Sequence, residues 1–139
     1  MKHRAFGMVM AATLVLAAAG CKAPAPSKPN VPQTYVLFFR FDSADLTPEA
    51  RAIVDQAAAG IKIAKPSTVG IAGFADKAGT KAYNQHLSER RIDAVEKALT
   101  ADGIDPKLFL KIPLGESEPL AEPTADRRVE IRLAVAPGS

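Results

Sequence analysis

Residues 73–91 read GFADKAGTKAYNQHLSERR, and this stretch decides the fold because it joins a strand to a helix. Its first residues end an apolar, glycine-spaced run over 67–75, which predicts a buried strand. Asp76 follows that strand directly, and a short loop over 77–80 comes next. Apolar residues then recur at helical spacing over 81–102, ahead of a glycine that favours a helix end. We therefore expect a strand, a polar turn and a long helix.

Three polar side chains interrupt the apolar face of this helix. At about 100° of rotation per residue, Asn84, Ser88 and Arg91 fall among the apolar residues on the core-facing half. A buried guanidinium without partners would cost too much free energy to be incidental. We therefore expect Arg91 to face a carboxylate, a polar crevice or a ligand. An internal salt bridge that only orders the start of the helix explains the pattern equally well.

The flanking sequence completes an alternating pattern of strands and helices. β-forming residues predict a strand over 36–41, and Thr47 with the proline after it predicts the start of a helix. Two further strands are predicted over 109–114 and 128–135. The order βαβαββ implies an α/β (α+β) two-layer sandwich, in which two helices cover one face of a mixed four-stranded sheet.

The residues ahead of the first strand predict export and attachment to a membrane. Residues 1–20 have a basic head, an apolar run of about 15 residues and small residues at the end, which is the layout of a signal peptide. Cys21, the single cysteine, follows in the pattern of a bacterial lipobox, so we expect it to carry lipid; the alternative is a free thiol after ordinary cleavage. Residues 21–33 hold four prolines and predict an extended tether. A domain over 34–136 and a tail at 137–139 would follow.

Charge and composition argue against several classes of function. The sequence pI is about 9.1, but removing residues 1–20 takes away two basic residues and no acidic one. The remaining chain is nearly neutral and gives no reason to expect nucleic acid as a partner. Neither a cluster with metal-ligand spacing nor a GxSxG motif is present, so the sequence predicts no metal, no cofactor and no catalysis.

Two aspartates are candidate partners for the buried arginine. Asp42 and Asp76 each follow an expected strand end, so both side chains could lie at one edge of the sheet. An aspartate beside a glycine loop and a helix start can accept backbone N–H bonds and stay ionised. Beside Arg91 it could hold a zwitterion, because the aspartate binds an ammonium group and the guanidinium fork binds a carboxylate. That combination recognises the head group of an amino acid.

The same residues carry a family resemblance. Residues 73–80, together with the pairs at 83–84 and 87–88 and with Arg91, resemble the signature of OmpA-like C-terminal domains with its spacing intact. The flanks agree, and the resemblance covers essentially residues 36–135. With the predicted lipidated cysteine and tether, the chain resembles the peptidoglycan-associated lipoproteins of that family. The agreeing flanks are Phe41-Asp42-Ser43, Gly115-Glu116-Ser117 and Arg127-Arg128-Val129.

The resemblance implies a module that binds the peptidoglycan stem peptide without cleaving it. It would grip the free amino acid centre of diaminopimelate, with Asp76 accepting the ammonium group and Arg91 binding the carboxylate. The domain would lie in the periplasm, attached to the outer membrane through lipid on Cys21, and envelope proteins of the Tol type would be further partners. Residues that would line or shape the pocket are Asp42, Ser43, Gly79, Asn84 and Leu87.

Two residues depart from the family pattern, and two other interpretations stay open. Phe74 stands where the family usually has histidine, which removes a polar group near the pocket, and Leu114 replaces a common aromatic residue. The first alternative is a structural or protein-docking lipoprotein of the same fold that does not bind the wall. The second is an enzyme that uses Asp42 and Asp76 as a carboxylate pair on wall glycans.

Overall fold

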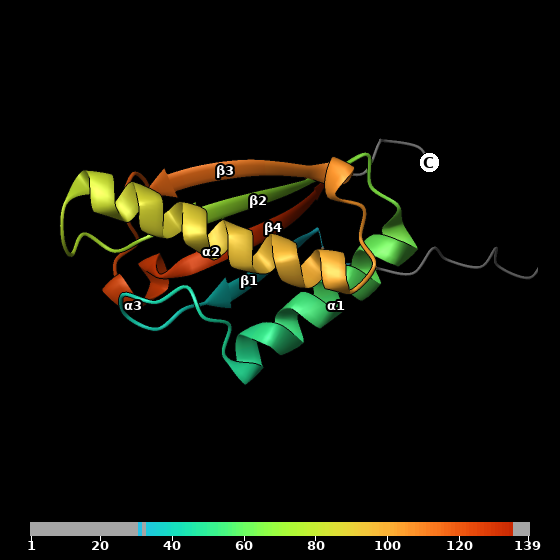
Figure 1. Ribbon diagram of the computed structural model, residues 1–139, viewed down its shortest axis with the longest axis horizontal. Helices are drawn as coiled ribbons and strands as arrows, with labels where there is room; N and C mark the ends of the chain where they lie inside the picture. The colour runs from blue at the N-terminus through green and yellow to red at the C-terminus, as the bar shows by residue number, and fades with distance from the viewer. Residues whose placement is uncertain (1–30, 32, 135–139) are drawn as a thin grey trace, which may run out of the picture.

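The computed structural model describes residue 31 and residues 33–134. The predicted leader, Cys21, most of the tether and the tail lie outside the described residues. The described part of the chain contains four strands, two long helices and two short helices (Figure 1). In chain order they are β1 (Thr34–Phe38), α1 (Pro48–Ala64), β2 (Thr68–Phe74), α2 (Lys81–Ala101), the 3-10 helix η1 (Pro106–Leu108), β3 (Phe109–Gly115), α3 (Pro123–Asp126) and β4 (Arg128–Ala134).

The predicted βαβαββ order is confirmed, and the two short helices are additions to it. Because η1 has three residues and α3 has four, neither is long enough to show a helical period in the sequence. The first strand was predicted over 36–41, but β1 begins at Thr34 and ends at Phe38. β1 ends there because Phe38 pairs with Arg128, the first residue of β4, so residues 39–41 have no strand residue opposite them. The chain then turns at Asp42, which has a left-handed backbone conformation with φ of 49°.

The sheet is mixed, with the strand order β1-β4-β2-β3. β4 lies between β1 and β2 and is antiparallel to both, whereas β2 and β3 are parallel. β1, β2 and β3 therefore run in one direction, and their carboxyl ends meet at one edge, which we call the carboxyl edge (left in Figure 1). β4 begins at this same edge, so the loops after three strands and the start of the fourth converge there.

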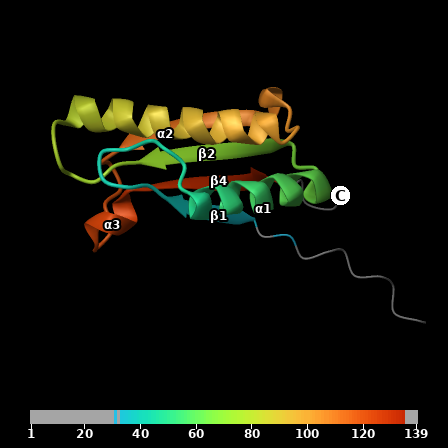
Figure 2. The ribbon, with the colours of Figure 1, turned by 60° about the horizontal axis from the view of Figure 1, so that its bottom comes forward.

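Both long helices cover one face of the sheet, as predicted (Figures 1 and 2). Each helix begins with a threonine cap: Thr47 Oγ1 accepts a hydrogen bond from the Ala50 amide, and Thr80 Oγ1 accepts one from the Tyr83 amide, both at 3.2 Å. None of the helices among the described residues is long and apolar enough to span a membrane. The buried core between helices and sheet includes Leu37, Val54, Ile61, Ile71, Ile92, Val95, Leu99 and Ile131.

β2 and α2 approach each other closely at Gly73. A Cβ atom added at this glycine would lie 2.6 Å from the Ser88 carbonyl oxygen and 2.8 Å from Ile92 Cγ1. Contacts this short require the helix or the strand to shift, and the nearer one involves backbone. Only glycine lets the first half of α2 rest directly on the strand at this point.

We expect Gly73→Ala to lower the free energy of unfolding by about 1–3 kcal/mol, the usual cost of overpacking. Urea unfolding of the purified chain, followed by circular dichroism, measures this change. Gly70→Ala is the control in the same strand, because its added carbon would meet no atom closer than 3.8 Å. Equal unfolding midpoints for Gly73→Ala and the wild type would contradict the close approach.

Candidate functional site

The carboxyl edge gathers the seven binding residues that the sequence predicted. Two of them follow β1, two follow β2 and three lie in the first half of α2. The helical-wheel prediction is confirmed, because Asn84, Ser88 and Arg91 are all buried against the sheet. In chain order the seven are Asp42, Ser43, Asp76, Gly79, Asn84, Leu87 and Arg91.

Arg91 is fully buried and bonds to three backbone carbonyl groups. Its Nε donates to the Ser43 oxygen at 2.8 Å, its Nη1 to the Phe74 oxygen at 2.7 Å, and its Nη2 to the Arg40 oxygen at 3.2 Å. The guanidinium carbon lies 5.2 Å from the centre of the Phe39 ring. These hydrogen bonds go to carbonyls and not to a carboxylate, so the internal salt bridge considered as an alternative is not what holds the side chain. Arg91 joins α2 to the loop after β1 and to the last residue of β2.

The Arg91 guanidinium keeps its charge in this setting. Burial lowers the pKa of Arg91 to about 10, and the nearby carboxylates of Asp76 and Asp42 oppose that shift. The side chain is therefore a cation at neutral pH. Since three of its five N–H groups are engaged, two are left for another acceptor.

Asp76 is a largely buried carboxylate with two partners. Its Oδ1 accepts a hydrogen bond from the Ala78 amide at 3.1 Å, which confirms the expected backbone bond, and its Oδ2 lies 3.4 Å from Arg127 Nη1. The residue is 8% exposed. Asp76 thus contacts one guanidinium and senses the charge of a second, Arg91.

Arg127 has no predicted role of its own and belongs to a flank that resembles the family. The residue stands one position before β4, and β4 is antiparallel to β2, so Arg127 begins that strand at the carboxyl edge beside Asp76. The available signal was the expected start of a strand at residue 128. That signal alone does not place Arg127 beside Asp76. The placement also depends on the strand order, in which β4 lies between β1 and β2.

Asp42 lies at the exposed rim of the site. Its carboxylate accepts a hydrogen bond from the Tyr83 hydroxyl group. That hydroxyl also accepts a hydrogen bond of 3.4 Å from Arg90, whose guanidinium carbon lies 5.5 Å from the Tyr83 ring centre. Asp42 therefore pairs with the start of α2, and Ser43 beside it contributes its backbone carbonyl to Arg91.

Asn84 carries an unused acceptor at the bottom of the site. Its Nδ2 donates to Glu116 Oε2 at 2.7 Å, but its Oδ1 is buried without a hydrogen-bond partner among the described residues. Gly79 covers it with φ of 94°, and a side-chain carbon there would lie 3.8 Å from that oxygen. Leu87 is buried in the next turn of the helix. This oxygen can accept a hydrogen bond from a further donor.

Phe74, the departure from the family pattern, has its ring buried against Arg128. The guanidinium carbon lies 3.7 Å from the ring centre, and Arg128 is itself paired with Glu130 at 2.7 Å and Asp126 at 3.6 Å. The ring therefore gains a cation–π contact. The Phe74 backbone carbonyl still binds Arg91, so the substitution leaves that bond in place.

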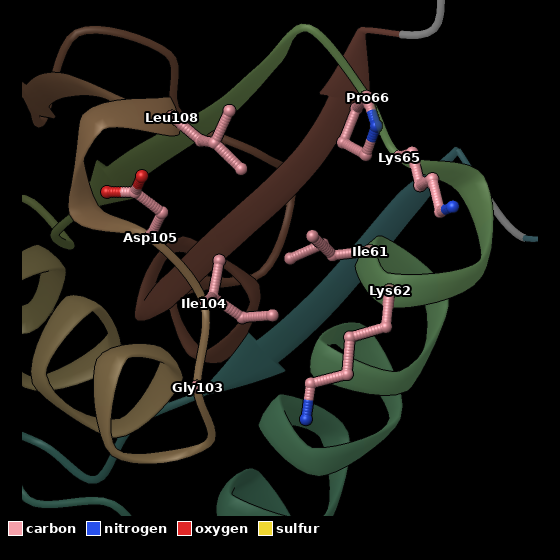
Figure 3. A pocket seen from close by; sticks show the side chains of 8 residues that line it. All are labelled: Ile61, Lys62, Lys65, Pro66, Gly103, Ile104, Asp105 and Leu108. Atoms are coloured by element: carbon pink, nitrogen blue, oxygen red, sulfur yellow. The ribbon is translucent and has the colours of Figure 1, made fainter.

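Two of the pockets on the described surface lie at opposite ends of the domain. One, of about 350 Å³, lies at the carboxyl edge and is lined by Phe38, Phe39, Thr124, Ala125 and Arg127. The other, of about 250 Å³, lies at the ends of α1 and α2, and Figure 3 shows the Ile61 side chain extending into it from α1 and the Lys62 side chain extending toward Gly103. None of the seven predicted residues lines either of these two pockets. The lining residues of the second pocket are Ile61, Lys62, Lys65, Pro66, Gly103, Ile104, Asp105 and Leu108.

Residues 38–132 match the OmpA family model. The chain is 38% identical over 116 residues to outer membrane protein A of Bordetella avium, which covers 79% of this chain and 60% of that protein. It is 37% identical over 101 residues to the peptidoglycan-associated lipoprotein of Pseudomonas putida, covering 68% and 60%. The solved structure of the peptidoglycan-associated lipoprotein from Burkholderia pseudomallei is similar at a TM-score of 0.66 and 27% identity, over 70% of this chain and 88% of that one. The chain spans 60% of the length of the two relatives.

Among residues 31 and 33–134, no three or more His, Cys, Asp or Glu side chains are grouped so that they could hold a metal ion. The names of the relatives above refer to a membrane or to association with peptidoglycan, and not to a reaction.

Replacing Arg91 tests its role in holding the carboxyl edge together. Arg91→Met leaves three carbonyl oxygens, one of them buried, without their donor, so we expect the free energy of unfolding to fall by at least about 3 kcal/mol. Arg90→Met is the matched control on the exposed side of α2 and should change it by less than about 1 kcal/mol. Urea unfolding of both variants measures the difference, and equal losses would rule out the anchoring role.

Proposed function

The chain belongs to the OmpA family, and on that basis we propose that its domain binds the stem peptide of peptidoglycan at the carboxyl edge without cleaving it. The observation that carries the proposal is Asp76, a nearly buried carboxylate set beside one guanidinium and within the field of another. An anion beside cations suits a ligand that brings both charges. The names of two matched proteins, which refer to peptidoglycan association, support the choice of polymer.

The ligand group that fits this chemistry is the free amino acid centre of diaminopimelate. We assign its ammonium group to Asp76 and its carboxylate to the cationic side of the site, where Arg91 has two N–H groups that no carbonyl engages. The unpaired Asn84 Oδ1 is available to accept one further N–H from the ligand. Asp42 and Ser43 would form the rim, while Gly79 and Leu87 would shape the floor.

A weak binding site is enough to retain a protein that is also attached to the membrane beside its ligand. A few charge-assisted hydrogen bonds of about 1.5–3 kcal/mol each, less the cost of association, give a micromolar or weaker affinity. A lipid on Cys21 would keep the domain next to a wall that repeats its ligand many times, so retention reflects effective concentration. In this proposal the protein links the outer membrane to the wall from the periplasmic side, and Tol-type envelope proteins are further candidate partners.

Substitution of Asp76 tests the wall-binding proposal. The whole chain, purified in mild detergent, is mixed with diaminopimelate-type peptidoglycan and the bound fraction is measured after sedimentation. Asp76→Asn should weaken retention by about 10–100-fold, because a charge-assisted bond to the ligand is lost. Asp55→Asn is the matched control, since Asp55 is exposed on α1 and pairs with Arg51.

Either of two results would contradict the proposal. Retention of Asp76→Asn equal to that of the wild type would place the ligand elsewhere. A folded wild type that is not retained at all would favour the alternative, a protein-docking lipoprotein of the same fold.

The proposed anchor is tested by labelling bacteria that express the chain with radioactive palmitate. The wild-type protein should take up label and fractionate with the outer membrane, whereas Cys21→Ala should do neither. An immunoblot of the same cells checks that both proteins are present in equal amounts. Label on Cys21→Ala would show that the lipid is attached at another residue.

A further inference from the structure

The end of the domain opposite the carboxyl edge is where the chain enters, and we call it the entry end. β1 starts there at Thr34, and Val31 before it lies beside Gly60, since a Cβ atom added at Gly60 would lie 3.1 Å from Val31 Cγ1. The next residue of α1, Ile61, lines the pocket of about 250 Å³ shown in Figure 3. The pocket therefore adjoins the point at which the chain enters the domain.

The entry end exposes an apolar surface. Ile61 and Pro66 line the pocket at the end of α1, and Ile104 and Leu108 line it from the segment between α2 and β3. Ile63, in the last turn of α1, is 55% exposed to solvent. The pocket is smaller than the range of about 300–1,000 Å³ that is usual for ligand sites, so it has room for part of a lipid and not for a whole one.

Lysines surround this apolar surface. Lys62 and Lys65 stand on either side of Ile63 in the sequence, and Lys107 lies in η1. All three lysines are exposed, and none of them forms a salt bridge within the described part of the chain. Their ammonium groups can therefore bind anions outside the domain.

The acidic residues next to the pocket already have partners. Asp102, which caps α2, forms a salt bridge with Arg51. Asp105 Oδ1 accepts a hydrogen bond of 3.0 Å from the Lys107 amide. The three lysines outnumber these two carboxylates, and one carboxylate is already matched by an arginine. The entry end is therefore cationic around an apolar centre.

We propose that the entry end rests on the membrane and binds anionic phospholipids there. Ile63 would enter the boundary between head groups and acyl chains, while the lysines bind lipid phosphates and the pocket holds part of one lipid. An apolar side chain among lysines is the chemistry of proteins that bind at a membrane surface. Attraction of lysines to anionic lipids acts only within about a Debye length, so it requires this close contact.

The position of the predicted anchor favours a membrane over other partners. The inference rests on the lipid attachment in the proposed function, in which residues 22–30 separate the lipid on Cys21 from Val31. At about 3.1 Å per residue these residues reach roughly 30 Å, so the membrane always lies near the entry end. A weak attraction is then enough, because the contact is intramolecular in effect. This orientation turns the carboxyl edge away from the membrane.

A single tryptophan can report the contact, because the chain has none of its own. The whole chain is expressed in bacteria, purified from their membranes in mild detergent and reconstituted into vesicles. The vesicles consist of phosphatidylcholine brominated on its acyl chains, with or without about 30% phosphatidylglycerol as the anionic lipid. Ile63→Trp places the reporter at the entry end. Phe41→Trp is the matched control, because Phe41 is 64% exposed at the carboxyl edge.

We expect bromine to quench the fluorescence of Ile63→Trp by at least about half when phosphatidylglycerol is present, since the side chain would lie roughly 5–10 Å deep. Quenching should be weaker without phosphatidylglycerol, and Phe41→Trp should not be quenched in either kind of vesicle. Raising the salt concentration from about 0.05 M to about 0.5 M should also weaken the quenching of Ile63→Trp. The salt measurement keeps every lysine, so it does not depend on how a lysine variant folds.

Two pairs of substitutions then test the lysines in the Ile63→Trp protein. Lys62→Gln with Lys65→Gln should remove the effect of phosphatidylglycerol, because losing two lysines lowers the ratio of docked to free domain by about 30-fold. Lys77→Gln with Lys81→Gln should leave that effect unchanged, since these lysines are equally exposed but lie at the carboxyl edge.

Three results would overturn the inference. If Ile63→Trp is quenched no more than Phe41→Trp, the entry end does not rest on the membrane, while retention by peptidoglycan and the proposed function are unaffected. Quenching that depends neither on phosphatidylglycerol nor on Lys62 and Lys65 would show that anionic lipids are not bound. If the protein does not float with the vesicles, the proposed lipid attachment fails and the inference fails with it.

Discussion

The buried guanidinium of Arg91 is the interaction on which the carboxyl edge depends. It crosses from α2 to carbonyl groups of residues 40, 43 and 74, which belong to two segments that share no backbone hydrogen-bond ladder at that point. A cation without a salt-bridge partner is an expensive group to bury, and here its burial is compensated by three oriented carbonyl dipoles and by the field of nearby carboxylates. The geometry of the rim and the position of Asp76 both follow from that one side chain.

The strand order explains why opposite charges meet at this edge. β1, β2 and β3 end there, and carboxylates stand in the loops that follow the first two. β4, inserted in the opposite direction, starts there and brings arginines with it. A sheet with all four strands parallel would have placed the start of the fourth strand, and hence Arg127, at the far edge. The mixed topology is therefore what sets Arg127 beside Asp76.

The sequence could predict features that depend on neighbouring residues, and it could not predict those that depend on residues far apart in the chain. The helical period correctly buried Asn84, Ser88 and Arg91, because a local rotation of about 100° per residue decides which face a side chain occupies. The sequence could not predict the hydrogen-bond partners of Arg91. These partners depend on the left-handed turn at Asp42, which has no periodic signal in the sequence. β-forming residues up to Phe41 predicted a longer strand, but tertiary contacts end it at Phe38. Arg127 was missed for the same non-local reason, because its place depends on which strands pair.

The entry point of the chain lies at the end of the sheet opposite to the site. β1 begins at Thr34, which pairs with Arg132 near the end of β4, and it runs from there toward the carboxyl edge. Tension between a membrane-attached N-terminus and a ligand held at that edge would act along the axis of β1. Because the hydrogen bonds of an antiparallel pair are perpendicular to the strands, such a pull shears all five paired positions of β1 and β4 at once. In the proposed arrangement a pull therefore loads the hydrogen bonds of this strand pair together instead of one after another.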